Sequence, residues 1–141
     1  PVCQCQRSEE ALTMSPHPSL NRMSAFTRML GLEFKSIEVG TCTLTLPIRE
    51  DHFNSTARVH GGVIFSLLDS AMGAAAFSVL EPHESTATVE CKINYTRAVV
   101  GGELECVGTV VHAGTRTVVV DGEIRQDGAL VAKALGTFAR I

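Results

Sequence analysis

One acidic residue, Asp69, stands inside a long apolar stretch and is the first candidate for chemistry. The stretch runs from Val59 to Leu80, reads VHGGVIFSLLDSAMGAAAFSVL, and holds no other formal charge at neutral pH. A helix that is apolar on nearly every face is usually buried, and burial of an unpaired carboxylate is costly. Asp69 is therefore a candidate functional acid, the alternative being a structural carboxylate bonded to a backbone group or a buried water.

The same stretch opens with His60, Gly61 and Gly62, which give the predicted helix a flexible N-terminus. Free N–H groups at such an end attract negative charge. Gly61 and Asp69 lie about 12 Å apart along the helix axis, and about 900° of rotation puts His60 and Asp69 on opposite faces. The acid and the anion-binding end can therefore meet in one site only if a second chain supplies one of them.

Composition bounds the class of protein. The 141 residues suit one globular domain, and the net charge of −3 offers no basic field for nucleic acid. A stretch this long raises the possibility of a membrane span, but Asp69 and the lack of flanking charge bias favour a buried core helix.

The cysteines lack zinc-ligand spacing and fit a reducing cytosol, and no signal peptide is visible, so we expect a cytoplasmic protein without a metal site. They are Cys3, Cys5, Cys42, Cys91 and Cys106.

The elements that position these residues follow from periodicity. Residues 1–18 show none and are predicted to be a disordered tail, which leaves residues 19–141 as the folded domain. Apolar spacing predicts a helix over Leu20–Leu30 and strands over Leu32–Pro47 with a turn or bulge at Gly40. A polar loop then precedes the long helix, which should end near Pro82.

Four further strand-like runs complete the sequence. Their connectors are short and glycine-containing, so we expect consecutive runs to be antiparallel neighbours. An α+β fold follows, in which a curved antiparallel β-sheet wraps around one long central helix. The runs are Ser85–Ala98, Glu103–His112, Arg116–Gln126 and Ala129–Arg140, joined through Gly101-Gly102, Ala113-Gly114 and Asp127-Gly128.

This order of elements resembles the hotdog fold, and the motifs resemble those of the PaaI-type acyl-CoA thioesterases. The resemblance rests on NSTARVHGG at residues 54–62, on Asp69 nine positions after His60, and on TVECKINY at residues 88–95. It covers the chain from about Leu32 to the C-terminus. Relatives often carry Gly where this chain has Ala57, a departure that concerns the conformation of the loop.

The resemblance implies an acyl-CoA thioesterase that releases a free acid and CoA without metal or organic cofactor. Asp69 would be the general base or nucleophile, the Gly61 N–H would polarise the thioester carbonyl, and Thr88 would orient the attacking water. Asn54 would position the water or the loop that holds His60. The site would lie at a two-fold dimer interface, with Asp69 and Thr88 from one subunit and Asn54 and the HGG segment from the other. A homotetramer built from two dimers is also implied.

Further substrate contacts are expected around the long helix. Gly62 belongs to its anion-binding end, and Arg97 is a candidate for the CoA phosphates. Phe65, Leu68 and Met72 are expected to form the pocket wall together with the first helix. Two alternatives remain: a hotdog hydratase or dehydratase acting on 3-hydroxyacyl thioesters, which needs an acid–base pair, and a non-catalytic acyl-CoA-binding module. No membrane or nucleic-acid partner is expected.

Overall fold

The structure, a computed structural model, describes residues 17–141. The predicted tail, residues 1–18, lies outside the described residues except for His17, which is buried, and Pro18, which is exposed and begins η1. In chain order the elements are η1 (Pro18–Asn21), α2 (Ala25–Leu30), β1 (Glu33–Glu38), β2 (Thr41–Pro47), η2 (Glu50–His52), α3 (Gly61–Phe77), β3 (Thr86–Tyr95), β4 (Glu103–Ala113), β5 (Thr117–Gln126) and β6 (Ala129–Arg140).

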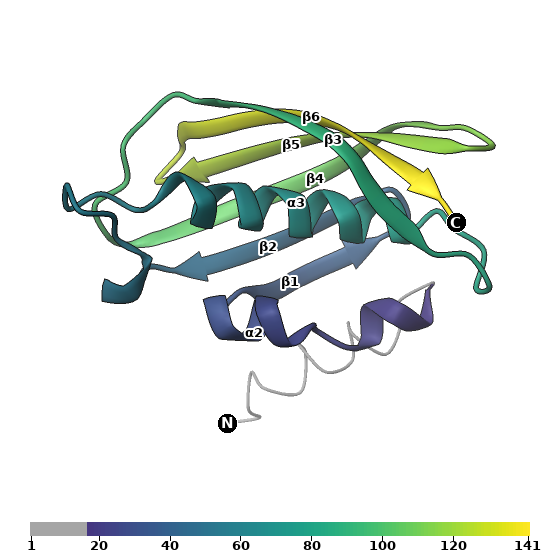
Figure 1. Ribbon diagram of the computed structural model, residues 1–141, viewed down its shortest axis with the longest axis horizontal. Coiled ribbons are helices and arrows are strands. Elements are labelled where there is room, and N and C mark those ends of the chain that lie inside the picture. Colours follow the sequence, from purple (N-terminus) through teal and green to yellow (C-terminus); the bar gives the residue numbers. More distant parts are fainter. Residues whose placement is uncertain (1–16) are drawn as a thin grey trace.

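The strands form one six-stranded antiparallel sheet that curves along α3 without closing into a barrel (Figure 1). The strand order is β1-β2-β4-β5-β6-β3, so β1 and β3 are the two edges. Along the central strands β4 and β5, buried residues alternate with more exposed ones, so one face of the sheet packs against the helix. The α+β architecture predicted from periodicity is confirmed.

Strand β3 is not a neighbour of β4, and the prediction from the short connector is wrong at this point. It pairs with β6, while β4 pairs with β2. Residues 96–102 pass beside the N-terminal end of α3, where Val59 donates a 2.9 Å backbone hydrogen bond to the buried Val99. Because these contacts hold the connector across the sheet, β3 becomes an edge strand.

Three glycines in the sheet set how closely α3 approaches it. A Cβ at Gly122 would lie 2.5 Å from Met72 Sδ, and one at Gly108 would lie 2.6 Å from the carbonyl oxygen of Ala71. Gly136 faces Met72 in the same way. Side chains at these positions would push the helix off the sheet, so the glycines allow α3 to be buried against it.

The predicted helix over Leu20–Leu30 is two short helices, η1 and α2. Ser24 interrupts it because its hydroxyl accepts a 3.1 Å hydrogen bond from the Thr27 N–H and caps α2. Gly31, at φ 82°, ends α2 in the left-handed conformation. The buried His17 ring packs 5.0 Å from that of Phe77 and donates to the Glu84 carbonyl, which attaches η1 to the end of α3.

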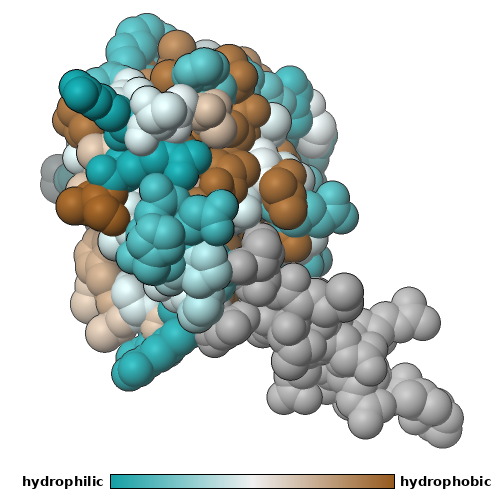
Figure 2. Space-filling view, turned by 90° about the vertical axis from the view of Figure 1, so that its right-hand side faces the viewer, coloured by the Kyte–Doolittle hydropathy of each residue, from teal (hydrophilic) through white to brown (hydrophobic). Residues whose placement is uncertain are grey.

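No helix within residues 17–141 has the length and apolarity of a membrane span. At the end of the molecule that carries the C-terminus, hydrophobic and hydrophilic side chains lie side by side on the surface (Figure 2). The core lies between α3 and the concave face of the sheet, and Phe138, Leu44, Leu67 and Leu104 are among its largest fully buried side chains.

Candidate active site

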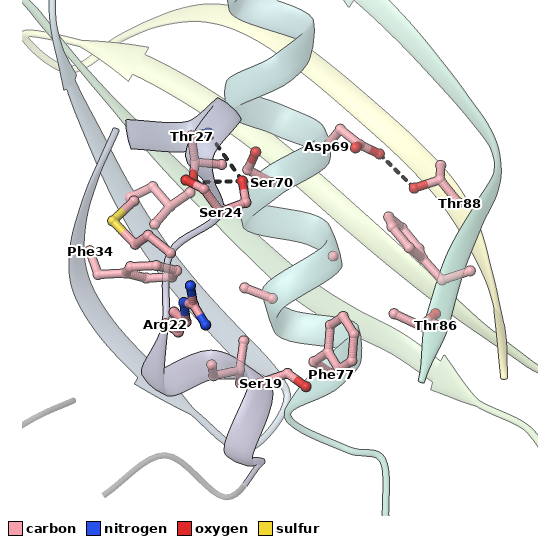
Figure 3. A pocket seen from close by; sticks show the side chains of 16 residues that line it. Ser19, Arg22, Ser24, Thr27, Phe34, Asp69, Ser70, Phe77, Thr86 and Thr88 are labelled. Carbon is pink, nitrogen blue, oxygen red and sulfur yellow. Dashed lines mark hydrogen bonds between the residues drawn. The ribbon is translucent and has the colours of Figure 1, made fainter. Parts of the chain in front are cut away.

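Asp69 lies near the middle of α3 and is half-buried, with its carboxylate turned toward β3. Thr88 Oγ1 donates a 2.8 Å hydrogen bond to Asp69 Oδ1 (Figure 3). A bulge interrupts the β3–β6 ladder between Thr88 and Glu90, and bulges re-aim side chains locally. The sequence predicted a buried carboxylate. In the structure it lines a cavity, and the Thr88 hydroxyl is its hydrogen-bond partner.

That cavity, the acid cavity, has a volume of about 270 Å³ and extends between α3, β3 and the N-terminal segment. Asp69, Thr88 and Arg22 supply polar groups to its lining. Its apolar wall consists of Leu20, Met23, Phe34, Leu44, Phe77 and Phe138. Residues of η1 and of the start of α2 contribute to this lining, and an apolar chain or ring fits it.

The side chains of α3 that were expected to form the pocket wall do not line the acid cavity. Leu68 and Met72 are fully buried and lie against the sheet at Gly122, on a different face of the helix from Asp69. Phe65 is half-buried and lines neither of the two cavities described here. On a helix that is apolar all round, the sequence does not indicate which face meets the sheet. A role for these residues in the substrate pocket stays a prediction.

The loop before α3 is organised by Asn54. Its Oδ1 accepts hydrogen bonds from the N–H groups of Thr56 at 2.9 Å and Arg58 at 3.2 Å, and its own N–H donates to the Arg58 carbonyl at 2.7 Å. Ala57, inside this turn, has φ 58°, a left-handed conformation that suits glycine better. Asn54 thus fixes the shape of the loop that leads to His60.

A second histidine, His52, anchors this loop and was not found by sequence reasoning. It is buried, its Nδ1 accepts from the Arg49 N–H at 3.0 Å, and its Nε2 donates to the Leu30 carbonyl at 2.8 Å. The His52 carbonyl accepts from the His60 N–H at 2.8 Å. A lone histidine in a polar loop carries no local signal of these long-range contacts.

The N-terminus of α3 presents a free backbone donor. His60 is the N-cap, and its Nδ1 accepts from the Gly62 N–H at 2.8 Å. The hydrogen bonds within residues 17–141 leave the Gly61 N–H without an acceptor. Tyr95 donates from its hydroxyl to the Gly61 carbonyl at 2.9 Å, and burial raises the pKa of Tyr95, so the hydroxyl stays protonated. The sequence motif contained Tyr95 but gave it no role.

A second cavity, the amide cavity, lies at this end of the helix and has a volume of about 340 Å³. Asn54, Gly61 and Tyr95 line it together with two exposed arginines, Arg58 and Arg97. Gly62 is exposed but does not line it. The pair of guanidinium groups makes this cavity electropositive, which suits an anionic ligand group.

The two cavities have no lining residue in common. Asp69 and Thr88 belong to the acid cavity, whereas Asn54 and Gly61 belong to the amide cavity. Within one chain the structure therefore separates the candidate catalytic residues into two groups, as the helical spacing of Gly61 and Asp69 requires.

The described residues contain no group of three or more His, Cys, Asp or Glu side chains with metal-binding geometry. Their three cysteines are free thiols. Burial raises the pKa of Cys42 to about 12 and also raises that of Cys106, so both stay protonated in the core. Burial, and then the charge of Asp69, raises the pKa of Cys91. The core thiols therefore pack as small hydrophobic side chains.

Comparison with known proteins places this geometry in a family. Residues 57–133 match the family model of the thioesterase superfamily. The acyl-coenzyme A thioesterase PaaI of Escherichia coli is 31% identical over 121 residues, which cover 83% of each chain. Its solved structure, described as the PaaI protein from the phenylacetic acid degradation operon, superposes with a TM-score of 0.83 at 27% identity and covers 94% of this chain and 95% of that one.

A solved structure from Pseudomonas aeruginosa, the conserved protein PA5202, is 44% identical and superposes with a TM-score of 0.82. The match covers 84% of this chain and 95% of that one. The family match, the relatives and the curved sheet around one helix agree with the resemblance noted in the sequence. The chain therefore belongs to the thioesterase superfamily and is a thioester hydrolase with the hotdog fold.

Proposed function

We propose that this protein is an acyl-CoA thioesterase that converts an acyl- or aryl-CoA into the free acid and CoA. The observation that carries the proposal is the pair of half-sites: a carboxylate held by a hydroxyl in an apolar cavity, and a free helix N-terminal N–H in an electropositive one. The relative from Escherichia coli is named for the same activity.

In the acid cavity, Asp69 acts on the thioester carbon. As a general base it takes a proton from water, whose oxygen adds to the carbonyl carbon; the C–S bond then breaks and the CoA sulfur leaves with that proton. As a nucleophile it attacks the carbon directly, the C–S bond breaks and the CoA thiolate leaves, so that an anhydride between Asp69 and the acyl group remains. Water then hydrolyses this anhydride, which releases the acid and restores the Asp69 carboxylate, and the proton that water gives up ends on the CoA sulfur. Thr88 holds Oδ1 in either case, which leaves Oδ2 for the reaction.

In the amide cavity, the Gly61 N–H stabilises the oxyanion that develops on the carbonyl oxygen. Asn54 fixes the loop that sets the direction of this donor. Arg97, with Arg58 beside it, binds the phosphates of CoA. Water, one carboxylate and backbone donors suffice for these steps, so we propose that no metal or organic cofactor takes part.

The complete site is formed by two copies of the chain. A rise of about 12 Å between Gly61 and Asp69 along one helix is too long for a single thioester carbonyl to bridge, and the two residues line different cavities. The minimum active unit is thus a homodimer, and we expect a tetramer of two dimers. The free thiols suit a reducing compartment, so we propose that the protein acts in the cytoplasm.

Complementation between inactive subunits tests this proposal. Asn54→Ala and Asp69→Ala are each purified and then combined by co-expression with two tags. In a mixed dimer one shared site receives both lesions and the other receives neither, so activity returns to at most about half of wild type if the sites act independently. Thiol release from a panel of short, long and aromatic acyl-CoA esters measures it. Verified mixed dimers that stay inactive would show that the two residues do not come from different chains.

A further inference from the structure

The first turn of α3 has little rigidity of its own, although the proposed reaction depends on the direction of one of its N–H groups. The helix begins with Gly61 and Gly62, and glycine loses more conformational freedom on entering a helix than any other residue. The first N–H groups of an α-helix also lack partners inside the helix. Contacts from outside the helix are therefore needed to fix this turn.

Two side chains hold the peptide unit between Gly61 and Gly62. The Gly62 N–H donates to His60 Nδ1 at 2.8 Å, and the Gly61 carbonyl accepts from the Tyr95 hydroxyl at 2.9 Å. These groups lie on opposite sides of one peptide plane, so the two hydrogen bonds together restrict its rotation. Only the two backbone dihedrals of Gly61 separate this plane from the free Gly61 N–H. Tyr95 lies 34 residues further along the chain, so its bond ties the turn to the end of β3.

The Tyr95 side chain also packs directly on Gly61. A Cβ at position 61 would lie 3.3 Å from the Tyr95 hydroxyl oxygen and 3.4 Å from its Cζ. Such a contact is tighter than normal, so a side chain at position 61 would push the hydroxyl away from the carbonyl. The glycine at this position therefore allows the ring to approach and the 2.9 Å hydrogen bond to form.

The Tyr95 hydroxyl acts here as a hydrogen-bond donor, because a carbonyl oxygen can only accept. Its proton is used in the bond to the Gly61 carbonyl, and burial raises the pKa of Tyr95, so the donor is present at neutral pH. Tyr95 lines the amide cavity beside Gly61. Its effect on a reaction in this cavity is therefore exerted through the backbone of the helix.

We propose that Tyr95 is a positioning residue whose hydroxyl holds the first turn of α3, so that the Gly61 N–H is directed at the developing oxyanion. The inference rests on the proposed function, in which the Gly61 N–H is the oxyanion donor. A donor fixed in advance stabilises an oxyanion because it need not be reoriented during the reaction. Loss of one neutral hydrogen bond should lower kcat about three- to tenfold, less than the roughly 10²–10³-fold cost of losing an oxyanion donor.

The test compares Tyr95→Phe with wild type. Tyr95 is 49% exposed, and phenylalanine keeps the ring on Gly61, so the variant should fold. Thiol release from an acyl-CoA should show kcat lowered about three- to tenfold with KM nearly unchanged. The urea unfolding midpoint and the nitrogen-15 order parameters of Gly61 and Gly62 are measured on the same samples, and the order parameters should fall in Tyr95→Phe.

Two unreactive analogues of the substrate report on the donor itself. In the first, a methylene group replaces the thioester sulfur and the carbonyl carbon is labelled with carbon-13. Its carbonyl resonance should move downfield on binding to wild type, because a donor polarises the carbonyl, and should move less in Tyr95→Phe. In the second, a methylene group replaces the carbonyl and the sulfur stays, so its Kd should be the same for both proteins.

Thr41→Val is the matched control. The Thr41 hydroxyl donates a 3.1 Å hydrogen bond to the Gly108 carbonyl, and Thr41 lines neither cavity. This variant also removes one bond from a side-chain hydroxyl to a backbone carbonyl. It should keep the wild-type kcat, the wild-type order parameters at the start of α3 and the wild-type carbonyl resonance of the bound ketone.

The outcomes separate the inference from the proposed function. Wild-type kcat in Tyr95→Phe overturns the inference, while the thioesterase activity stands. A lower kcat with an unchanged carbonyl resonance also overturns it, because Tyr95 then does not act through the donor. Weaker binding of the analogue without a carbonyl would show that Tyr95 contacts the substrate elsewhere, which likewise overturns a positioning role. Wild-type protein that releases no thiol from any acyl-CoA removes the proposed function, and the inference fails with it.

Discussion

Replacement of Asp69 by asparagine separates the chemical role of this residue from its structural one. Asparagine keeps the size of the side chain and an Oδ1 that accepts the 2.8 Å hydrogen bond from Thr88, so the fold should be retained. It removes the base or nucleophile, and loss of a general base costs about 10²–10⁴ in rate. That range corresponds to about 2.7–5.5 kcal/mol of transition-state stabilisation.

The assay is thiol release from an acyl-CoA under saturating conditions, with KM and the urea unfolding midpoint measured on the same samples. Thr88→Val is the matched variant, because it keeps the carboxylate and removes one charge-assisted hydrogen bond, worth about 1.5 kcal/mol, or roughly tenfold in kcat. The reasoning is refuted if Asp69→Asn turns over within about threefold of wild type. If it unfolds instead, Asp69 is a structural carboxylate.

Three further changes test the packing, the loop and the N-terminal residues. Gly122→Ala places a Cβ 2.5 Å from Met72 Sδ and should lower the free energy of unfolding by about 1–3 kcal/mol in a urea titration. Gly101→Ala is the control, because no atom lies within 4 Å of a Cβ at that position, and it should leave the free energy of unfolding nearly unchanged. Ala57→Gly relieves a residue at φ 58° and should raise the stability by up to about 1 kcal/mol without loss of activity. Removal of residues 1–16 should leave kcat and KM for small acyl-CoA esters unchanged, and a large rise in KM would assign those residues to the substrate channel.

The sequence by itself determined the features that depend on local pattern. Alternation and turn residues predicted the strands, the apolar run predicted α3, and its lone Asp69 and HGG entry indicated the two groups of candidate site residues. Helical geometry alone separated Gly61 from Asp69, because rise and rotation per residue do not depend on the rest of the fold. The resemblance to the family added Thr88 to the candidate residues, and in the structure its hydroxyl donates a hydrogen bond to Asp69.

Only the tertiary structure decided which surfaces meet. An all-apolar helix carries no local signal for the face that packs on the sheet. Leu68 and Met72 were predicted to line the pocket, whereas in the structure both are buried against the sheet at Gly122. Local turn signals also placed β3 beside β4, whereas pairing with β6 put it at the edge. The contacts of His52 and Tyr95 join segments far apart in the sequence. Such contacts arise from long-range packing and strand pairing, which periodicity along the chain does not encode.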